Sequence, residues 1–508
     1  MSDYRNAQEW VSDIHQHGSA RWADAAHLVS RGYGPNSRHL LGYLPSEFSD
    51  YGAMPVTYGG ARHQLIVAPT RGGKGVSGAI PRLLDHPGST VVLDIKDGEL
   101  ALITALYRRD VLGQYVHIID PYDCVCSKLG LSPSRLNPVD GVGLEDLDPF
   151  DAALEIAEAC VIPDGQGESH WSGEAAAIIA GLILSEAQQS GDLGGVRRKL
   201  NRDAEQFAEL VDQMAHSPYE LIRSAAARIL NKADRELSGV VSTAQRNTHF
   251  LESSSLSSSL SGTDIDLRNI GENTSIFIVL PGRRIRAAKR WLRVLVSTFI
   301  NTVTSLEDKP AIPVMILLEE MPTLERMEII ERSFGQMAGY GLQLVCVVQD
   351  FTQLNDLYKN RWETFIANAA SVQCFGTNDF FTARYLSQLG GSGTIERLAY
   401  GSAHQRVSFF GSPDYRSMSD GLAGRLLITP DELMSLHPSV QVVKLAASRP
   451  FIGYRPVYFL DRRYRDRYDQ PLYSIHPHHA HRPIEHSIDF TAPGTDLGAI
   501  LAETLGVG

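Results

Sequence analysis

A short apolar segment that runs into a glycine-rich turn carries the residue types most suited to chemistry in this sequence. Residues 65–75 read Leu-Ile-Val-Ala-Pro-Thr-Arg-Gly-Gly-Lys-Gly. Glycines let backbone N–H groups converge on phosphate oxygens, and a lysine can reach the β- and γ-phosphates of a nucleoside triphosphate. The pattern therefore predicts a phosphate-binding loop. Its expected nucleotide-binding residues are Pro69, Thr70, Arg71, Gly72, Gly73, Lys74, Gly75 and Val76.

The loop departs from the common pattern G-x-x-x-x-G-K-[ST] at two positions. Ala68 replaces the first glycine, and Gly75 replaces the residue whose hydroxyl binds Mg²⁺. Thr70 or Ser77 could supply that hydroxyl if the loop geometry permits. The motif alone leaves open an ordinary glycine-rich turn between a strand and a helix.

A second motif lies far downstream. Residues 313–320 read Pro-Val-Met-Ile-Leu-Leu-Glu-Glu, an apolar run that ends in two carboxylates. Such a run is typical of a buried parallel strand whose C-terminal end faces a ligand. One carboxylate can hold Mg²⁺ while the next polarises the attacking water, and Lys74 neutralises charge on the leaving group. A buried strand that merely ends in a solvated Glu-Glu pair is the alternative, but the two motifs together predict an NTPase.

Composition limits the other functional classes. The 508 residues are 43% hydrophobic and 21% charged, which is ordinary for a soluble protein of two or three domains. We find no apolar run of about 18 residues and no signal peptide, so we expect a cytoplasmic protein. A net charge of −12 confines any nucleic-acid contact to local basic surface. An odd number of cysteines without C-x-x-C spacing argues against a disulfide framework or a zinc ribbon: Cys124, Cys126, Cys160, Cys346 and Cys374.

Short β-branched runs separated by helical patterns predict an α/β fold with a doubly wound, mostly parallel sheet. The expected strands are Gln64–Ala68, Thr90–Ile95, Tyr115–Asp120, Ser275–Leu280, Val314–Leu318, Leu342–Val348, Ser371–Phe375 and Val440–Leu445. Between them, amphipathic helices replace strands: Ala152–Ala159, Gly173–Gln188, Ala204–Met214 and Pro218–Lys232.

We therefore predict a nucleotide-binding domain divided by an all-α insertion. Residues 1–139 form the N-terminal segment and the first part of the nucleotide-binding domain, 140–262 the insertion, and 263–470 the second part. The serine-rich stretch 253–261 is expected to be the return linker or to cap a helix. Residues 471–508 form a tail rich in Pro and His, for which a poorly ordered segment is favoured over a metal site.

An ordered set of motifs extends from residue 18 to about 470. Besides residues 68–76 it comprises Gly18–Ala23, Val92–Leu100, Asn137-Pro138, Trp171, Ser238–Ala244 and Gln349–Leu354. This set resembles the type IV secretion coupling proteins, the TraG-like conjugative DNA transfer ATPases. The resemblance implies a RecA-like P-loop motor domain of the FtsK/HerA group with an inserted all-α domain. It also implies a homo-hexameric ring, with ATP and Mg²⁺ as cofactors.

The resemblance further implies partners and residue roles. The ring would deliver single-stranded DNA with an attached relaxase, or protein effectors, to components of a type IV secretion channel. It would act at the cytoplasmic face of the bacterial inner membrane. Lys74 corresponds to the family's P-loop lysine, Glu320 to its catalytic carboxylate and Gln349 to a polar γ-phosphate sensor. Glu319 occupies the metal-binding position that usually holds Asp.

The family usually begins with a pair of transmembrane helices, whereas here the segment Gly18–Ala23 lies close to Met1. Either this is a naturally soluble member or the anchor lies outside this chain. In the first case, membrane contact would come only through other subunits.

Several charged residues have open roles. Asp94, Lys96 and Glu99 follow a predicted strand and line either the active site or a capped turn before a helix. The basic run 283–293 is either a solvated helix face or a surface for DNA or a neighbouring subunit. For residues 462–468 a salt-bridged surface is favoured over a DNA strip. The candidate arginine fingers are Arg384, Arg397 and Arg425.

A different class of function remains possible on the sequence alone. The chain could be a docking receptor that uses ATP only to switch its assembly state and moves nothing. An FtsK-like pump for double-stranded DNA is a further alternative. Stimulation of ATP hydrolysis by single-stranded DNA would favour the coupling-protein motor.

Overall fold

A large β-sheet organises the computed structural model, which describes residues 17–49, 53–143, 148–162, 169–336, 339–402 and 416–468. Within these residues the sheet has eleven strands. From one edge to the other they are β2 (Met54–Tyr58), β1 (His39–Leu44), β13 (Phe451–Tyr454), β12 (Val440–Leu445), β9 (Ser371–Cys374), β3 (Gln64–Val67), β8 (Leu342–Val348), β7 (Val314–Leu318), β4 (Thr90–Asp94), β6 (Thr274–Val279) and β5 (Tyr115–Ile119).

The sheet has a parallel part and an antiparallel part. The strands from β9 to β5 pair in parallel. The strands from β9 back to β2 pair antiparallel. The predicted α/β fold with a mostly parallel sheet is therefore confirmed.

The eight predicted strands all form, each within one residue of its expected ends. Continuous β-branched runs suit strands that are covered on both faces, and every residue of β3, β4, β7 and β8 is buried. Sequence reasoning missed β1, β2 and β13, whose glycine, proline and aromatic residues do not form such a run. Their places are fixed by successive antiparallel pairs, in which β13 pairs with β12, β1 with β13 and β2 with β1.

Helices cover both faces of the parallel part. Ile66 of β3 packs in one hydrophobic cluster with α2 (Ile80–Asp85) and α3 (Glu99–Asp110). Its neighbours Leu65 and Val67 belong to the cluster on the other face, which contains α12 (Ile285–Thr304). The remaining helices outside the helical insertion are α1 (Ala25–Ser30), α4 (Cys126–Leu129), α13 (Glu328–Gln336), α14 (Phe351–Tyr358), α15 (Glu363–Asn368), α16 (Phe380–Gly390) and α17 (Pro430–Met434).

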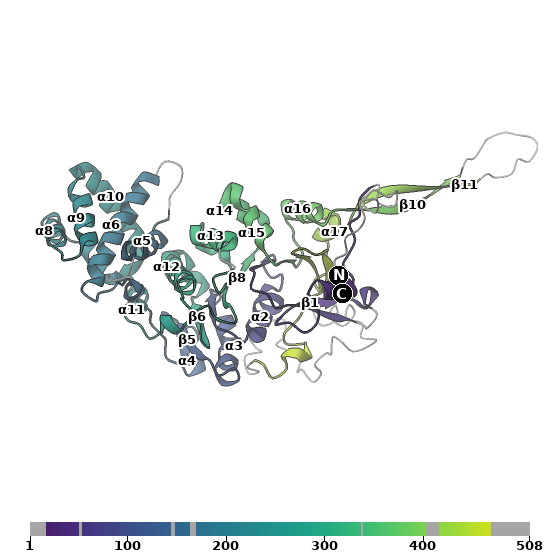
Figure 1. The fold of residues 1–508 in the computed structure, drawn as a ribbon, viewed down its shortest axis with the longest axis horizontal. Helices are drawn as coiled ribbons and strands as arrows, with labels where there is room; N and C mark the ends of the chain where they lie inside the picture. The colour runs from purple at the N-terminus through teal and green to yellow at the C-terminus, as the bar shows by residue number, and fades with distance from the viewer. Residues whose placement is uncertain are drawn as a thin grey trace, which may run out of the picture.

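A helical bundle interrupts the sheet between β5 and β6, which are neighbours in space. It contains α5 (Pro149–Cys160), α6 (Ser169–Ala187), α7 (Leu193–Leu200), α8 (Ala204–Ala215), α9 (Glu220–Leu230), α10 (Asp234–Thr248) and α11 (Ser254–Ser259). Figure 1 shows the bundle at one end of the molecule. The serine-rich stretch includes α11, whose Leu256 is buried, so it is not simply an unstructured linker. The exact domain boundaries remain a prediction, and the His-rich tail lies outside the described residues.

The opposite end carries a two-stranded hairpin that no sequence pattern predicted. Strands β10 (Ser392–Ser402) and β11 (Arg416–Leu426) pair antiparallel and extend away from the sheet (Figure 1). A bridge between Ser19 and Gly393 ties the N-terminal segment to its base. None of the helices in the described part of the chain combines the length and apolarity needed to cross a membrane.

A buried polar network joins the two parts of the sheet. Arg82 of α2 donates to Gln64 of β3, to Gln373 of β9 and to the Leu40 carbonyl of β1. The Gln373 amide donates to the Leu41 carbonyl at 2.8 Å and to Gln441 of β12 at 2.9 Å. Because buried polar groups are costly when unpaired, these bonds favour this strand order over alternatives.

We predict that Gln373→Leu lowers the free energy of unfolding by about 2–4 kcal/mol, because it removes three bonds within a buried network around a guanidinium. Urea denaturation at neutral pH measures this loss. The matched control is Gln388→Leu on the exposed side of α16, which should change stability by less than about 0.5 kcal/mol. Equal stability of the two variants would contradict the role given to the network.

Candidate nucleotide-binding site

The C-terminal ends of four adjacent parallel strands bring the predicted site residues together. In the order β3, β8, β7 and β4, the strands are followed by the glycine-rich loop, Gln349, the Glu319–Glu320 pair and Lys96. Residues after neighbouring parallel strands meet at one sheet edge, where ligands of α/β proteins bind.

The glycine-rich loop forms a tight turn after β3. The Gly72 N–H donates to the Pro69 carbonyl at 2.9 Å, and Gly73 has a φ of 80°. A side chain at Gly72 would place its Cβ 2.8 Å from the Pro69 carbonyl oxygen, so this turn has no room for one. A π-helical segment, Lys74–Ala79, follows and leads into α2. The turn therefore exposes backbone at the start of a helix, as a phosphate cradle requires.

Lys74, Glu320 and Gln349 contact one another. The Lys74 ammonium pairs with Glu320 Oε2, and both side chains are largely buried, with 6% and 15% exposed. Gln349 Nε2 donates to Glu320 Oε1 at 2.9 Å, and the Thr70 hydroxyl donates to Gln349 Oε1 at 3.3 Å. One hydrogen-bonded chain thus runs from the loop to the predicted catalytic carboxylate.

Glu319 lies beside this chain and pairs with Lys96 through Oε1. Its Oε2 is buried and has no hydrogen-bond partner among the residues that the structure describes. Burial raises the pKa of Glu319, although Lys96 opposes the shift. A buried carboxylate with a free oxygen fits Mg²⁺, which prefers hard oxygen ligands together with phosphates and water. No group of three or more His, Cys, Asp or Glu side chains in the described ranges forms a metal cage by itself.

The segment after β4 lies partly in the site and partly forms a capped turn before α3. Its three charged residues take different positions: Asp94, Lys96 and Glu99. Lys96 lies in the site through its pair with Glu319. Asp94 instead accepts from the Ala101 N–H of α3 at 2.9 Å, and burial raises its pKa well above the ordinary value. The Glu99 carboxylate lies 3.8 Å from where a Cβ at Gly75 would be. Ser77 is buried at the same turn, whereas Thr70 is already engaged by Gln349.

The basic run 283–293 is only partly a surface. Arg293 is buried and donates to the carbonyls of Ala159, Leu324 and Arg326. Arg290 donates to the Cys160 carbonyl and to Asn247 in the helical bundle. The interpretation of this run as a solvated or DNA-facing helix face is therefore wrong for Arg290 and Arg293. These two arginines hold the helical bundle and the segment between β7 and α13 against α12. Arg283, Arg284 and Arg286 are exposed.

The structure does not single out one of the three candidate arginine fingers. Arg384 is exposed on α16, Arg425 pairs with Glu432, and Arg397 lies in β10. In the segment 462–468, Arg463 pairs at 3.0 Å with the buried carboxylate of Asp85 in α2, so this pair is not part of the expected solvated, salt-bridged face. One residue that the sequence reasoning missed is Arg455, which touches the phosphate-binding loop but stands alone in an unremarkable Tyr-Arg-Pro segment.

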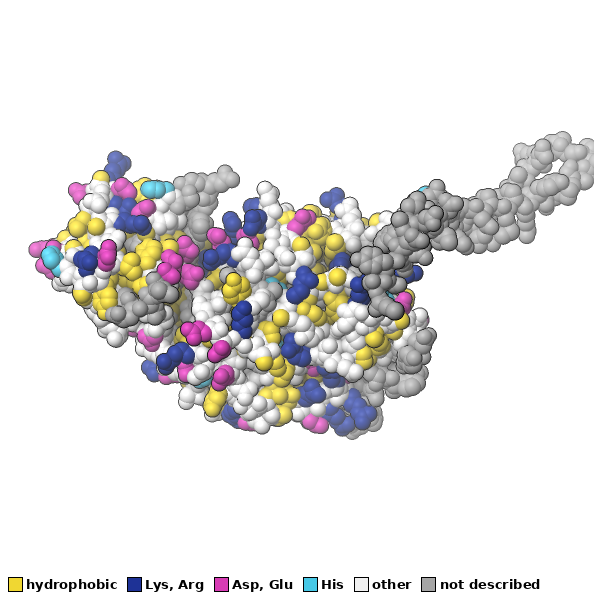
Figure 2. All heavy atoms as spheres, in the orientation of Figure 1, with side chains coloured by type: hydrophobic (Ala, Val, Ile, Leu, Met, Phe, Trp, Pro, Cys, Tyr) yellow, Lys and Arg dark blue, Asp and Glu magenta, His cyan; other side chains and the backbone are white. Residues whose placement is uncertain are grey.

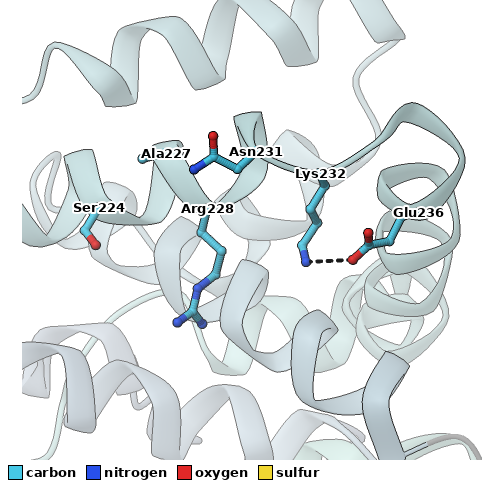
Figure 3. Close-up of a pocket in the computed structure, with 6 residues that line it drawn as sticks. All are labelled: Ser224, Ala227, Arg228, Asn231, Lys232 and Glu236. Carbon is cyan, nitrogen blue, oxygen red and sulfur yellow. Dashed lines mark hydrogen bonds and ion pairs between the residues drawn. The ribbon is translucent and has the colours of Figure 1, made fainter.

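A separate cavity of about 450 Å³ lies between α9 and α10 (Figure 3). Its six lining residues are Ser224, Ala227, Arg228, Asn231, Lys232 and Glu236. Lys232 pairs with both Glu174 and Glu236, so its ammonium is already neutralised. The cavity lacks a glycine turn and belongs to the helical bundle rather than to the strand ends, so it is not the phosphate site.

Comparisons with known proteins identify the family of this chain. Residues 21–479 match the family described as type IV secretory system conjugative DNA transfer. The chain belongs to this family. It is 25% identical to the conjugal transfer protein TraG of Escherichia coli over 500 residues, which covers 88% of this chain and 77% of TraG. It is 26% identical to VirD4 of Rhizobium radiobacter over 476 residues, covering 90% of this chain and 66% of VirD4.

Solved structures support the fold assignment. The plasmid coupling protein TrwB bound to the ATP analogue ADPNP aligns with a TM-score of 0.63, at 15% identity, over 88% of this chain and 95% of that one. TrwB bound to ADP and Mg²⁺ aligns with a TM-score of 0.60, at 17% identity, over 86% of this chain and 93% of that one. This conjugative DNA transfer protein thus has the RecA-like P-loop fold of TrwB.

We predict that Lys96→Met lowers the free energy of unfolding by about 1–3 kcal/mol in EDTA, because it leaves the Glu319 carboxylate buried without a cation. The loss is below that for a fully buried pair, since the Lys96 side chain is 41% exposed. Urea denaturation beside the exposed control Lys128→Met measures it. A loss no greater than that of the control would show that the pair does not hold Glu319.

Proposed function

We propose that this conjugative DNA transfer protein is an ATPase that drives single-stranded DNA, with an attached relaxase, or protein effectors into a type IV secretion channel. The contact between Lys74, Glu320 and Gln349 at the end of three parallel strands carries the proposal. Family membership supplies the transport context. We further propose that it works as a homo-hexamer on the cytoplasmic side of the inner membrane.

The loop residues 69–76 would bind the phosphates through backbone N–H groups and the Lys74 ammonium. Lys74 is paired with Glu320 in the structure, so phosphate binding must draw the lysine away from this carboxylate. Gln349 keeps its hydrogen bond to Glu320 Oε1 during that exchange and holds the carboxylate in place. Glu320 can then accept a proton from an attacking water, which is the role of a general base.

Glu319 would hold Mg²⁺, whose charge stabilises the β- and γ-phosphate oxygens when the ion is bound. Its unpartnered Oε2 is the atom suited to that contact, directly or through water. Lys96 neutralises the other oxygen through its ion pair.

Cargo recognition is proposed from the family rather than from a charged surface. Figure 2 shows basic and acidic side chains interspersed over the face in view, as expected for a chain of net charge −12. A DNA path would therefore use a local group of cations. The exposed Arg283, Arg284 and Arg286 are candidates, because they retain free surface at the start of α12.

ATP hydrolysis by the purified chain should rise on addition of single-stranded DNA at fixed low salt, and Lys74→Ala should reduce turnover by at least about 100-fold because no other cation of the loop can follow charge onto the β/γ oxygens. The control is Lys128→Ala. Stimulation only by duplex DNA would favour a double-stranded DNA pump. ATP-dependent relaxase binding with no DNA-stimulated turnover would favour a docking receptor.

The two carboxylates should separate in function. Glu320→Gln should retain ATP binding while hydrolysis falls about 10²–10⁴-fold, because an amide cannot act as the base. Glu319→Gln should instead raise the Mg²⁺ concentration required for half-maximal activity. Equilibrium binding of a fluorescent ATP analogue and Mg²⁺ titrations distinguish the variants. The reverse pattern would exchange the roles assigned to Glu319 and Glu320.

A further inference from the structure

Arg455 reaches the phosphate-binding loop from the antiparallel part of the sheet. It directly follows β13, and its backbone N–H donates to the Ser439 carbonyl at 2.9 Å. Its side chain is buried, and Nη1 donates to the Gly72 carbonyl of the loop at 2.5 Å. A residue almost four hundred positions downstream therefore touches the peptide that precedes Gly73.

One further contact holds the guanidinium beside the loop. Its Cζ lies 5.1 Å from the centre of the Phe375 ring, an arrangement that favours a cation. The Phe375 N–H donates to the carbonyl of Val67, the last residue of β3, at 3.0 Å. A Cβ at Gly73 would lie 3.2 Å from Arg455 Nη1, so the absence of a side chain there lets the guanidinium approach.

The charge of Arg455 has no anionic partner among the described residues. Its Nε likewise has no hydrogen-bond partner in the described part of the chain. Burial lowers its pKa to about 10, which still leaves the guanidinium charged at neutral pH. Buried charges are normally paired, because removing an ion from water is costly. No carboxylate in the described part of the chain balances this charge, and the loop that Arg455 touches is the place where an anion would do so.

Arg108 provides the contrast. It is equally buried, but it donates to the Ser275 hydroxyl and to the carbonyls of Leu83, His86 and Gly88. Those acceptors satisfy the guanidinium within the fold, so its role is structural. Arg455 makes a single side-chain hydrogen bond and one ring contact, which leaves its binding capacity incomplete.

We propose that Arg455 is a positioning residue of the nucleotide site, which fixes the Gly72–Gly73 turn and whose buried charge is completed by the phosphates of a bound nucleotide. The inference rests on the proposed function and deepens it. Arg455 would be a second cation from the same chain at this site. It would act by holding the loop and would not replace Lys74. It also means that phosphate binding is linked to the strands β12 and β13.

The decisive experiment compares Arg455→Met with Arg108→Met in the full chain. Replacing a buried arginine whose charge is unpaired with an apolar side chain of similar length is neutral or stabilising. Replacing a buried arginine whose hydrogen bonds are made within the fold leaves carbonyls without a donor. Arg455→Met should therefore melt at the same temperature as the wild type or higher without nucleotide. Its Kd for ATP, and for inorganic tripolyphosphate as a probe without a base, should rise about 10- to 100-fold.

Arg108→Met should do the opposite, melting at a lower temperature while the folded protein keeps its tripolyphosphate affinity. Arg455→Lys should recover part of the affinity, because it restores the charge but not the planar fork. Unchanged tripolyphosphate affinity in Arg455→Met would overturn the proposal. So would a loss of folding or a lower melting temperature without nucleotide in that variant, since either would make Arg455 a structural residue like Arg108.

The wild type and Lys74→Ala separate this proposal from the ATPase proposal. Binding by the wild type that is lost in Lys74→Ala but kept in Arg455→Met would refute only the role of Arg455. Absence of ATP and tripolyphosphate binding by the wild type would overturn both.

Discussion

Two lysine–carboxylate pairs at the edge of the parallel sheet are the constraint on which the site depends. Glu319 and Glu320 are consecutive at the end of β7, and they pair with lysines that follow different strands. Lys74 comes from the loop after β3, and Lys96 comes from the end of β4 on the other side of β7. Each carboxylate is buried, so each needs a cation, a proton or a metal to remain there.

The need of each carboxylate for a compensating charge predicts how the site would change when a nucleotide binds. On the proposed function, phosphates would compete with Glu320 for the Lys74 ammonium, and the phosphates carry more charge. If the lysine moved to the phosphates, Glu320 would lose its cation but could keep the amide hydrogen of Gln349. A carboxylate held by a neutral donor is a stronger proton acceptor than one neutralised by a lysine. Phosphate binding would thus activate the base that accepts a proton from the water attacking the same nucleotide.

The parallel part of the fold could be predicted from sequence because each of its strands is covered on both faces and reads as an uninterrupted apolar run. The loop, Glu319 and Glu320 could be predicted for a related reason: they follow such runs directly. The pair between Lys96 and Glu319 could only be suggested, since it requires the strand order. Arg455 could not be found, because its contact joins residues 383 positions apart and Arg455 follows β13, a strand that carries no strong pattern of its own.

The same antiparallel strands decide how rigidly the loop is held. Arg82 anchors α2, the helix that follows the loop, to β3, β9 and β1, while Arg455 anchors the turn itself. Arg82 is bonded to neutral amides and carbonyls on every side, so a phosphate in the loop gives it nothing new to bind. Among the described residues, the Arg455 side chain has one hydrogen bond and no carboxylate partner, so it would gain a partner when an anion binds. The helix end of the cradle is therefore fixed by the fold, and the turn is the part whose stability depends on the ligand.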